Sequence, residues 1–223
     1  MEHLLFIVDE KLPEELRPAV EKACRDAHAI YQIPSWITNL RREKGIEASD
    51  LVNSAKFTRR TEYGRQKDAK QILEAANERL ECNGRHIVFI TTSDITSPNK
   101  ERESGYLNFC FDLKSDGNAI VSMARFMDLS VKTQKTVLAG LIMQSIGYIF
   151  GVAGDPERAS TENNLGMHCT DKFCVMQQGL TKNKMVGVMR RAAIASKLPW
   201  RAKPHGAYYC PHCTRDIKST LLI

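Results

Sequence analysis

The sequence predicts an α+β fold followed by a small, irregular C-terminal lobe. Three observations lead to this prediction. An apolar run and two helical stretches open the chain, two further apolar runs are joined by a tight turn, and a long helix precedes a tail rich in loops. Strands and helices in this order are typical of a layered α+β domain with a second, smaller lobe.

The first part of the chain is predicted to hold one strand and two helices. Residues 3–10, HLLFIVDE, form an apolar run typical of a strand, and a helix is expected over residues 13–31 because Pro13 suits a first helical turn. Residues 34–62 are mixed in composition and are not assigned. Residues 65–80 have helical periodicity and good helix formers, so we expect a second helix there.

A buried strand and a hairpin are predicted next. Residues 86–95, HIVFITTSDI, are rich in β-branched side chains, which favour a strand. Residues 106–113 and 118–126 are two apolar runs separated by Asp116-Gly117, a dipeptide that favours a tight turn between strands.

The last third of the chain is predicted to contain two helices among irregular segments. A long apolar helix is expected over residues 132–150 and a basic helix over residues 182–197. Residues 151–164 form a polar loop, residues 165–179 a compact irregular stretch, and residues 199–223 a loop-rich tail.

Composition favours a soluble protein. The 223 residues suit one domain, or one domain with an appendage, and 43% of them are hydrophobic. No apolar run approaches the roughly 18 residues that cross a bilayer, and the apolar stretch from Leu4 to Val8 is too short for a secretory signal. We therefore expect a cytoplasmic protein that is not bound to a membrane. The net charge of +6 suits an acidic partner, but solvated surface lysines and arginines explain it more simply, so nucleic acid is not the favoured partner.

Seven cysteines are an odd number, and a cytoplasmic chain is not expected to form disulfides. Four of them form two closely spaced pairs late in the chain: Cys169 with Cys174, and Cys210 with Cys213. Two such pairs supply four thiolates to a tetrahedral zinc ion, which would add folding energy where little hydrophobic core is available. His168 and His212 lie beside the cysteines and could replace one of them.

Two other interpretations of these cysteines stay open. Cys-Pro-His-Cys, residues 210–213, is typical of redox-active dithiols, which open a helix near the start of a βαβ unit. Here the motif lies close to the end of the sequence, without room for the rest of such a fold. The cysteines could also be unpaired thiols.

The helical stretch LIMQSIGYIFG, residues 141–151, carries polar side chains on one face. Gln144 and Tyr148 are four residues apart, so they project from the same side of the helix, with Ser145 beside them. They either line a site or only fill space beneath the second lobe.

The stretch LGMHCTDKFCVMQQGL, followed later by a CxxC pair, resembles the archaemetzincin group of metzincin zinc peptidases. Their signature runs HExxH, a glycine, a third histidine followed at once by cysteine, then Cys-x-Met and a distal CxxC. In this sequence His168-Cys169 corresponds to the His-Cys step, and Cys174-Val175-Met176 corresponds to Cys-x-Met. The resemblance implies that Met176 belongs to the turn beneath the catalytic zinc.

The same resemblance implies a zincin fold, with a mixed, twisted sheet, two or three long helices and a C-terminal lobe closed by zinc. Residues 1–151 would form the N-terminal lobe with the active-site helix. Residues 152–223 would form the C-terminal lobe with the Met-turn and the four-cysteine zinc site.

The helix departs from the family pattern at each chemical position. The family's HExGHxFG reads QSIGYIFG here, so Gln144 stands for the first zinc ligand, Ser145 for the general base and Tyr148 for the second ligand. An amide oxygen is a poor zinc ligand, and tyrosine binds well only as a phenolate, whose free pKa is about 10. Serine cannot act as a base at neutral pH without a partner. Only His168 remains of the ligands, and an insertion over residues 152–167 separates it from the helix.

The leading hypothesis is a pseudopeptidase that keeps one structural zinc, lacks the catalytic zinc and acts by binding. A vestigial cleft lined by Gln144, Ser145, Tyr148 and His168 would take an extended peptide or protein segment. We expect the peptide to add to a strand edge at residues 122–126.

Two alternatives stay open. The first is an active zinc metallopeptidase with non-standard ligands, in which Tyr148 and His168 contribute to a metal site and Glu157 or Glu162 supplies a carboxylate. The second is a zinc-knuckle module that binds nucleic acid or regulates another protein through the basic stretch 182–191.

Overall fold

The computed structural model describes residues 3–38, 40, 44–80, 85–96, 110–113, 117–152, 159–160, 168–179, 181–199, 201 and 205–221. At its centre lies a five-stranded sheet in the order β2-β1-β5-β8-β7. Its strands are β1 (His3–Val8), β2 (Ser35–Thr38), β5 (Arg85–Thr91), β7 (Cys110–Leu113) and β8 (Asn118–Ser122). The first four strands of this order are parallel, and β7 runs antiparallel to β8 at the edge. The sheet is therefore mixed, as predicted.

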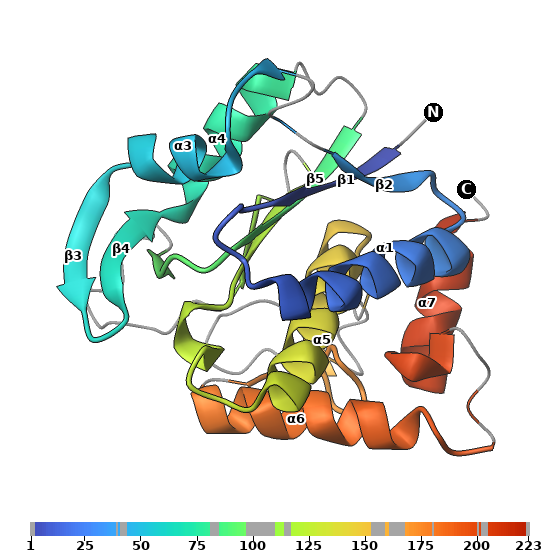
Figure 1. Ribbon diagram of the computed structural model, residues 1–223. Helices are drawn as coiled ribbons and strands as arrows, with labels where there is room; N and C mark the ends of the chain where they lie inside the picture. Colours follow the sequence, from blue (N-terminus) through green and yellow to red (C-terminus); the bar gives the residue numbers. More distant parts are fainter. Residues whose placement is uncertain are drawn as a thin grey trace.

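Helices cover both faces of this sheet (Figure 1). On one face lie α1 (Arg17–Tyr31) and α5 (Val131–Ile149), and on the other α3 (Ala48–Ser54) and α4 (Ala69–Leu80). The predicted helices over residues 13–31 and 132–150 are thus present, with a 3₁₀ turn η1 (Glu14–Leu16) ahead of α1.

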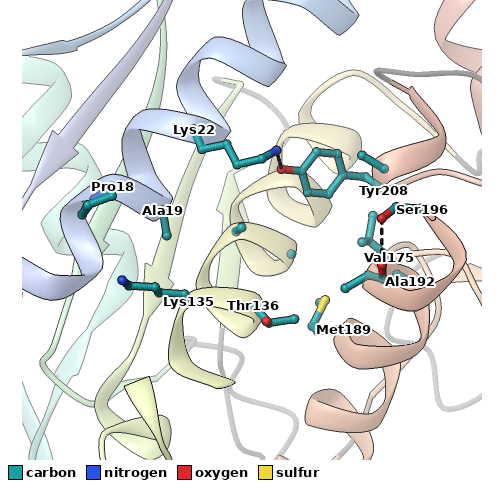
Figure 2. Close-up of a pocket in the computed structure, with 14 residues that line it drawn as sticks. Pro18, Ala19, Lys22, Lys135, Thr136, Val175, Met189, Ala192, Ser196 and Tyr208 are labelled. Carbon is teal, nitrogen blue, oxygen red and sulfur yellow. Dashed lines mark hydrogen bonds between the residues drawn. The ribbon is translucent and has the colours of Figure 1, made fainter. Parts of the chain in front are cut away.

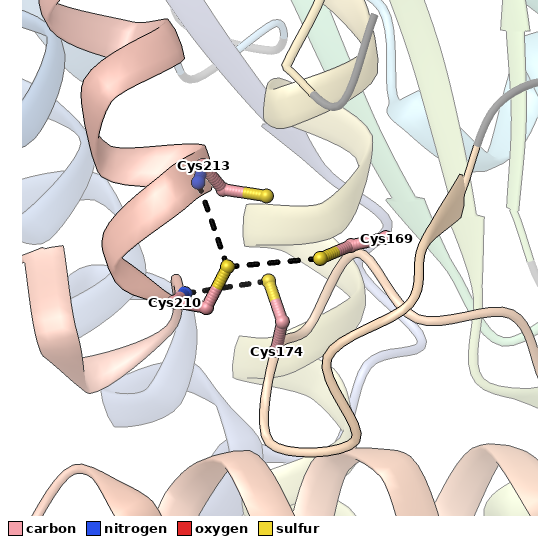
Figure 3. A group of neighbouring side chains, drawn as sticks. All are labelled: Cys169, Cys174, Cys210 and Cys213. Carbon is pink, nitrogen blue, oxygen red and sulfur yellow. Dashed lines mark hydrogen bonds between the residues drawn. The ribbon is translucent and has the colours of Figure 1, made fainter. Parts of the chain in front are cut away.

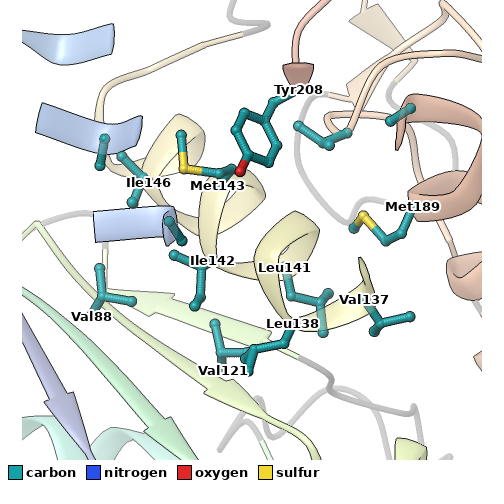
Figure 4. Close-up of a cluster of buried hydrophobic side chains, with 14 of the residues drawn as sticks. Val88, Val121, Val137, Leu138, Leu141, Ile142, Met143, Ile146, Met189 and Tyr208 are labelled. Carbon is teal, nitrogen blue, oxygen red and sulfur yellow. The ribbon is translucent and has the colours of Figure 1, made fainter. Parts of the chain in front are cut away.

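Two hydrophobic cores result from the alternation of side chains along the central strands. Leu4 and Phe6 of β1 join the core on the α1 and α5 side, whereas Leu5 and Ile7 join the core beneath α3 and α4. Figure 4 shows how α5 lies on the sheet through a row of aliphatic side chains. Those drawn on the helix include Leu138, Leu141, Ile142 and Ile146, and they face Val88 and Val121 of the strands.

The C-terminal part adds two helices outside this layer. α6 (Lys182–Ala195) packs against α5, and α7 (Pro211–Leu221) packs against α1 (Figure 1). Residues of both predicted lobes, such as Phe6 and Ile217, belong to one core. The lobe boundary at residue 151 stays a prediction.

Smaller elements complete the described chain. A second sheet pairs β3 (Phe57–Thr61) with β4 (Gly64–Asp68) and β4 with β6 (Ile95–Thr96), and β9 (Ala159–Ser160) pairs with β10 (His168–Cys169). Short 3₁₀ turns are η2 (Ala124–Phe126) and η4 (His205–Ala207). Among the helices that the structure describes, none combines the length and the apolar character needed to cross a membrane.

Two of the predicted elements are wrong in part. Residues 65–68 form strand β4 rather than the start of a helix. The sequence did not show this strand, because its inward positions hold the polar residues Gln66 and Asp68. Gln66 Nε2 donates to the main-chain oxygen of Ile95 at 3.1 Å, and this hydrogen bond allows the amide to be buried. The loop-rich tail contains helix α7, whose buried side is narrow and includes Cys213 and Ile217.

The proposed strand edge at residues 122–126 is also wrong. Strand β8 ends at Ser122 and has neighbours on both sides, β5 and β7. Residues 124–126 then form the 3₁₀ turn η2, in which Arg125 and Phe126 are buried. In the described part of the five-stranded sheet the edge on this side is β7.

Candidate metal centre and vestigial cleft

Four cysteine side chains meet between the loop that follows β10 and the start of α7 (Figure 3). They are Cys169, Cys174, Cys210 and Cys213, all buried, and their four sulfur atoms lie within 4.8 Å of one another. The sulfurs of Cys169 and Cys210 are 3.6 Å apart. A tetrahedral zinc with Zn–S bonds of about 2.3 Å separates its sulfur ligands by about 3.8 Å. The donor set and its spacing therefore fit zinc.

Backbone N–H groups point at three of these sulfurs. The N–H of Asp171 donates to Cys169 Sγ at 3.4 Å, that of Cys210 to Cys174 Sγ at 3.4 Å, and that of Cys213 to Cys210 Sγ at 3.5 Å. Hydrogen bonds donated to a thiolate favour the charged form, and they orient a metal ligand from outside its first coordination sphere.

The four thiols differ in acidity because they share hydrogen bonds. Contacts from Cys169, Cys174 and Cys213 lower the pKa of the Cys210 thiol, whereas the contact with Cys169 raises the pKa of Cys213. Burial raises the pKa of the Cys174 thiol. A zinc ion would replace the protons that remain, since the ligand is the thiolate.

Arg201 joins the two cysteine pairs from outside. Its side chain is buried, and Nη1 donates to the carbonyl of Phe173 at 3.0 Å and to that of Tyr209 at 3.3 Å. These carbonyls immediately precede Cys174 and Cys210. Arg201 could not be predicted from the sequence, because an isolated arginine in a loop-rich tail forms no recognisable pattern.

Neither neighbouring histidine belongs to the sulfur cluster. His212 is exposed, and its ring contacts Arg215 on α7. His168 turns instead toward α5, where Nδ1 shares a hydrogen bond with the hydroxyl of Tyr148. Within the described ranges, the four cysteines are the one group of three or more potential ligands that could hold a metal ion.

Gln144 on α5 uses its amide for structural hydrogen bonds. Nε2 donates to the carbonyl of Val175 at 2.7 Å and to that of Gln177 at 3.1 Å, and the side chain is only 2% exposed. These carbonyls flank Met176. At the position where the family resemblance places the first zinc ligand, this chain has an amide that ties the helix to the Met176 turn.

Met176 lies directly beneath the same helix. A Cβ atom added at Gly147 would lie 2.5 Å from Met176 Sδ, so the sulfur occupies the space that a side chain at this position would need. The role of Met176 in a turn beneath a catalytic zinc stays a prediction.

Ser145, Tyr148 and His168 are the other side chains that were expected to line a vestigial cleft. The Ser145 hydroxyl is buried and has no hydrogen-bond partner among the described residues. The rings of Tyr148 and His168 meet edge to face, with centroids 5.6 Å apart. His168 therefore faces the helix despite the long insertion. Glu157 and Glu162 lie outside the described residues.

The basic stretch 182–191 directs several of its cations toward the protein itself. Lys182 pairs with Asp128 at 2.6 Å, and Arg190 donates to the hydroxyl of Thr133 at 2.9 Å. Arg191 donates to the carbonyl of Lys172 and to the side chain of Gln177. These contacts explain several of the positive charges of this stretch as structural.

Comparison with known proteins finds similarity in three-dimensional structure. No protein-family model matches the sequence, and no curated protein matches it. The archaemetzincin from Methanopyrus kandleri is 15% identical with a TM-score of 0.58, and the match covers 100% of this chain and 96% of that chain. A zinc-dependent peptidase from Methanocorpusculum labreanum is 15% identical with a TM-score of 0.58, covering 96% of this chain and 99% of that chain.

A third structure agrees. The archaemetzincin from Archaeoglobus fulgidus, complexed with malonate, is 13% identical with a TM-score of 0.52, covering 96% of this chain and 99% of that chain. The chain therefore has an archaemetzincin-like fold, and the fold prediction is confirmed.

Proposed function

We propose that this chain, which has the archaemetzincin fold, is a catalytically inactive counterpart of those peptidases. In this proposal it holds one structural zinc in the cysteine cluster and acts by binding an extended peptide or protein segment.

The hydrogen bonds of Gln144 carry the argument for inactivity. A zinc peptidase needs protein ligands that leave an open position for water, and a carboxylate to accept the proton of that water. Here the Nε2 group at the first ligand position donates to two main-chain carbonyls, and a neutral serine stands at the position of the base. An imidazole at position 144 could not make the same pair of bonds, so the helix is adapted to the absence of a ligand.

The edge of the large sheet supports the proposed binding of a peptide. Among the residues that the structure describes, β7 pairs with β8 on one side and has no strand on the other, and α5 packs against it. Unpaired N–H and C=O groups of an edge strand accept an additional strand, which is how many domains bind extended peptides. The peptide would therefore add to β7 rather than to residues 122–126.

Two assays test this proposal together. A mixture of peptides is incubated with the zinc-loaded protein and analysed by mass spectrometry, and we expect no cleavage at any pH from 6 to 9. Peptides that bind are then N-methylated on alternate backbone amides. One set of methylations should weaken binding by about tenfold, because half of the amides of an added strand donate to the edge. Cleavage, or equal effects of both sets, would refute the corresponding half of the proposal.

One observation favours the alternative of an active hydrolase with unusual ligands. Tyr148 and His168 are in contact, so two side chains with metal-binding atoms lie together beside α5. If this pair supports hydrolysis, replacing His168 with alanine must abolish turnover while the cysteine cluster keeps its zinc.

A further inference from the structure

A groove distinct from the proposed peptide site lies between α1, α5 and α6 (Figure 2). Its volume is about 340 Å³, near the lower end of the range of about 300–1,000 Å³ that is usual for ligand pockets. The floor is buried and almost entirely apolar, and it includes Ala19, Gly140, Val175, Met189 and Ala192.

Small side chains leave this space open. Gly140 faces Met189 so closely that a Cβ atom would lie 2.2 Å from Met189 Sδ, which holds α5 and α6 close together at this point. Alanines line the surrounding walls from three helices. The hollow is therefore formed mainly by residues of three helices.

The neutral polar groups of the groove already have partners. The hydroxyls of Thr136 and Ser196 donate to carbonyls of their own helices at 3.0 and 2.7 Å. The hydroxyl of Tyr208 donates to the carboxylate of Asp26 at 2.5 Å. A ligand in this groove would find mainly apolar surface.

The charged side chains that line the groove have one sign. Two lysines, Lys22 and Lys135, belong to its lining, and no carboxylate does. Lys22 is paired with Asp26, which also binds Tyr208. Lys135 forms no ion pair with any residue that the structure describes. The groove therefore combines an apolar interior with one uncompensated ammonium group.

We propose that this groove binds a fatty carboxylate of medium chain length, with the aliphatic chain against the alanines of α1, α5 and α6 and the head group on Lys135. The volume suits a single short chain, and the charge selects an anionic head group over a neutral or cationic one.

Calorimetric titration of the zinc-loaded protein tests the proposal with octanoate, nonanoate and decanoate below their micelle concentrations. Affinity should rise about fourfold for each added methylene until the cavity is full, the factor expected for burying one CH₂. Decyltrimethylammonium has a similar apolar chain and the opposite charge, so it should bind at least tenfold more weakly than decanoate. Absence of binding, equal binding of the two amphiphiles, or affinity independent of chain length would overturn the proposal.

Two variants separate the head-group contact from the apolar contact. Lys135→Gln should weaken decanoate binding about three- to fivefold, as for a partly exposed ion pair, and leave the dependence on chain length unchanged. Lys132→Gln, on an exposed position of the same helix, is the matched control and should change nothing. Ala193→Phe should fill the groove and abolish binding, with thermal unfolding used to show that the variant is folded. An unchanged affinity in Lys135→Gln, or a dimer of the chain that Ala193→Phe dissociates, would contradict the assignment.

Discussion

At the scale of single residues, two adjacent positions of α5 have opposite energetic roles. Gln144 donates two buried hydrogen bonds, and the neighbouring hydroxyl of Ser145 has no partner among the described residues. In the sequence both residues belong to one degenerate motif, QSIGYIFG. Their different roles could not be predicted from this motif, because the hydrogen-bond partners of Gln144 lie in a turn about thirty residues later in the chain.

This difference predicts the stability of two variants. Gln144→Ala should lower the free energy of unfolding by roughly 2–4 kcal/mol, because it removes two hydrogen bonds and leaves two carbonyls without donors. Ser145→Ala should be neutral or slightly stabilising, because it removes a buried polar atom that gains nothing in return. Urea denaturation of the zinc-loaded protein measures both values, and equal effects of the two substitutions would show that Gln144 is not an anchor.

At the scale of elements, the two cysteine pairs depend on the connection between their loops. Arg201 donates from Nη1 to the carbonyls that precede Cys174 and Cys210. A lysine at this position retains the charge, but its ammonium lies one bond closer to the main chain than Nη1 and so does not reach both carbonyls. The positions of the cysteines should therefore become less well defined in that variant.

Arg201→Lys is accordingly expected to weaken zinc binding about tenfold, the lower end of the effect usual for groups that orient metal ligands. Competition with a chromogenic chelator measures this change. Arg215→Lys, on an exposed position of α7, serves as the control and should keep the affinity of the parent protein. If both variants lose affinity equally, the effect reflects α7 in general and not the connection made by Arg201.

The sequence predicted the elements that depend on apolar patterns and missed those that do not. The strand over residues 3–10 and the helices over residues 13–31, 132–150 and 182–197 each have a buried apolar pattern, and all are present. Strand β4 buries Gln66 and Asp68, and α7 has few inward apolar side chains. Such elements are fixed by distant partners, which a local pattern does not contain.

For the candidate metal site, the spacing of the cysteines along the sequence was informative, because a zinc site of this kind is built from closely spaced pairs of ligands. Two closely spaced cysteine pairs led to a four-sulfur cluster, which the structure brings together. The apolar groove beside Lys135 has no sequence motif, because it arises from the packing of α1, α5 and α6.

At the scale of the whole molecule, the cysteine cluster belongs to the same core as the sheet. All four cysteines lie in the hydrophobic core that also contains Phe6 of β1 and Ile217 of α7. Removal of zinc should therefore destabilise the entire protein and not only its C-terminal helix.

A strong chelator at neutral pH is expected to lower the melting temperature by roughly 10–20 °C in a single transition, corresponding to a loss of about 5 kcal/mol for a chain of this size. Cys174→Ser should reproduce this loss without chelator. Cys24→Ala, which removes a buried thiol outside the cluster, should retain zinc and its response to chelator. Calorimetry that shows two separate transitions would instead support independent lobes.

We propose that this archaemetzincin-like fold holds zinc at its cysteines and lacks the catalytic metal. The most direct test of this proposal is the number and position of zinc ions per chain, determined by elemental analysis of the purified protein and by an anomalous difference map at the zinc edge. We expect one zinc per chain, with density among Cys169, Cys174, Cys210 and Cys213. A second peak of full occupancy between α5 and His168 would contradict it.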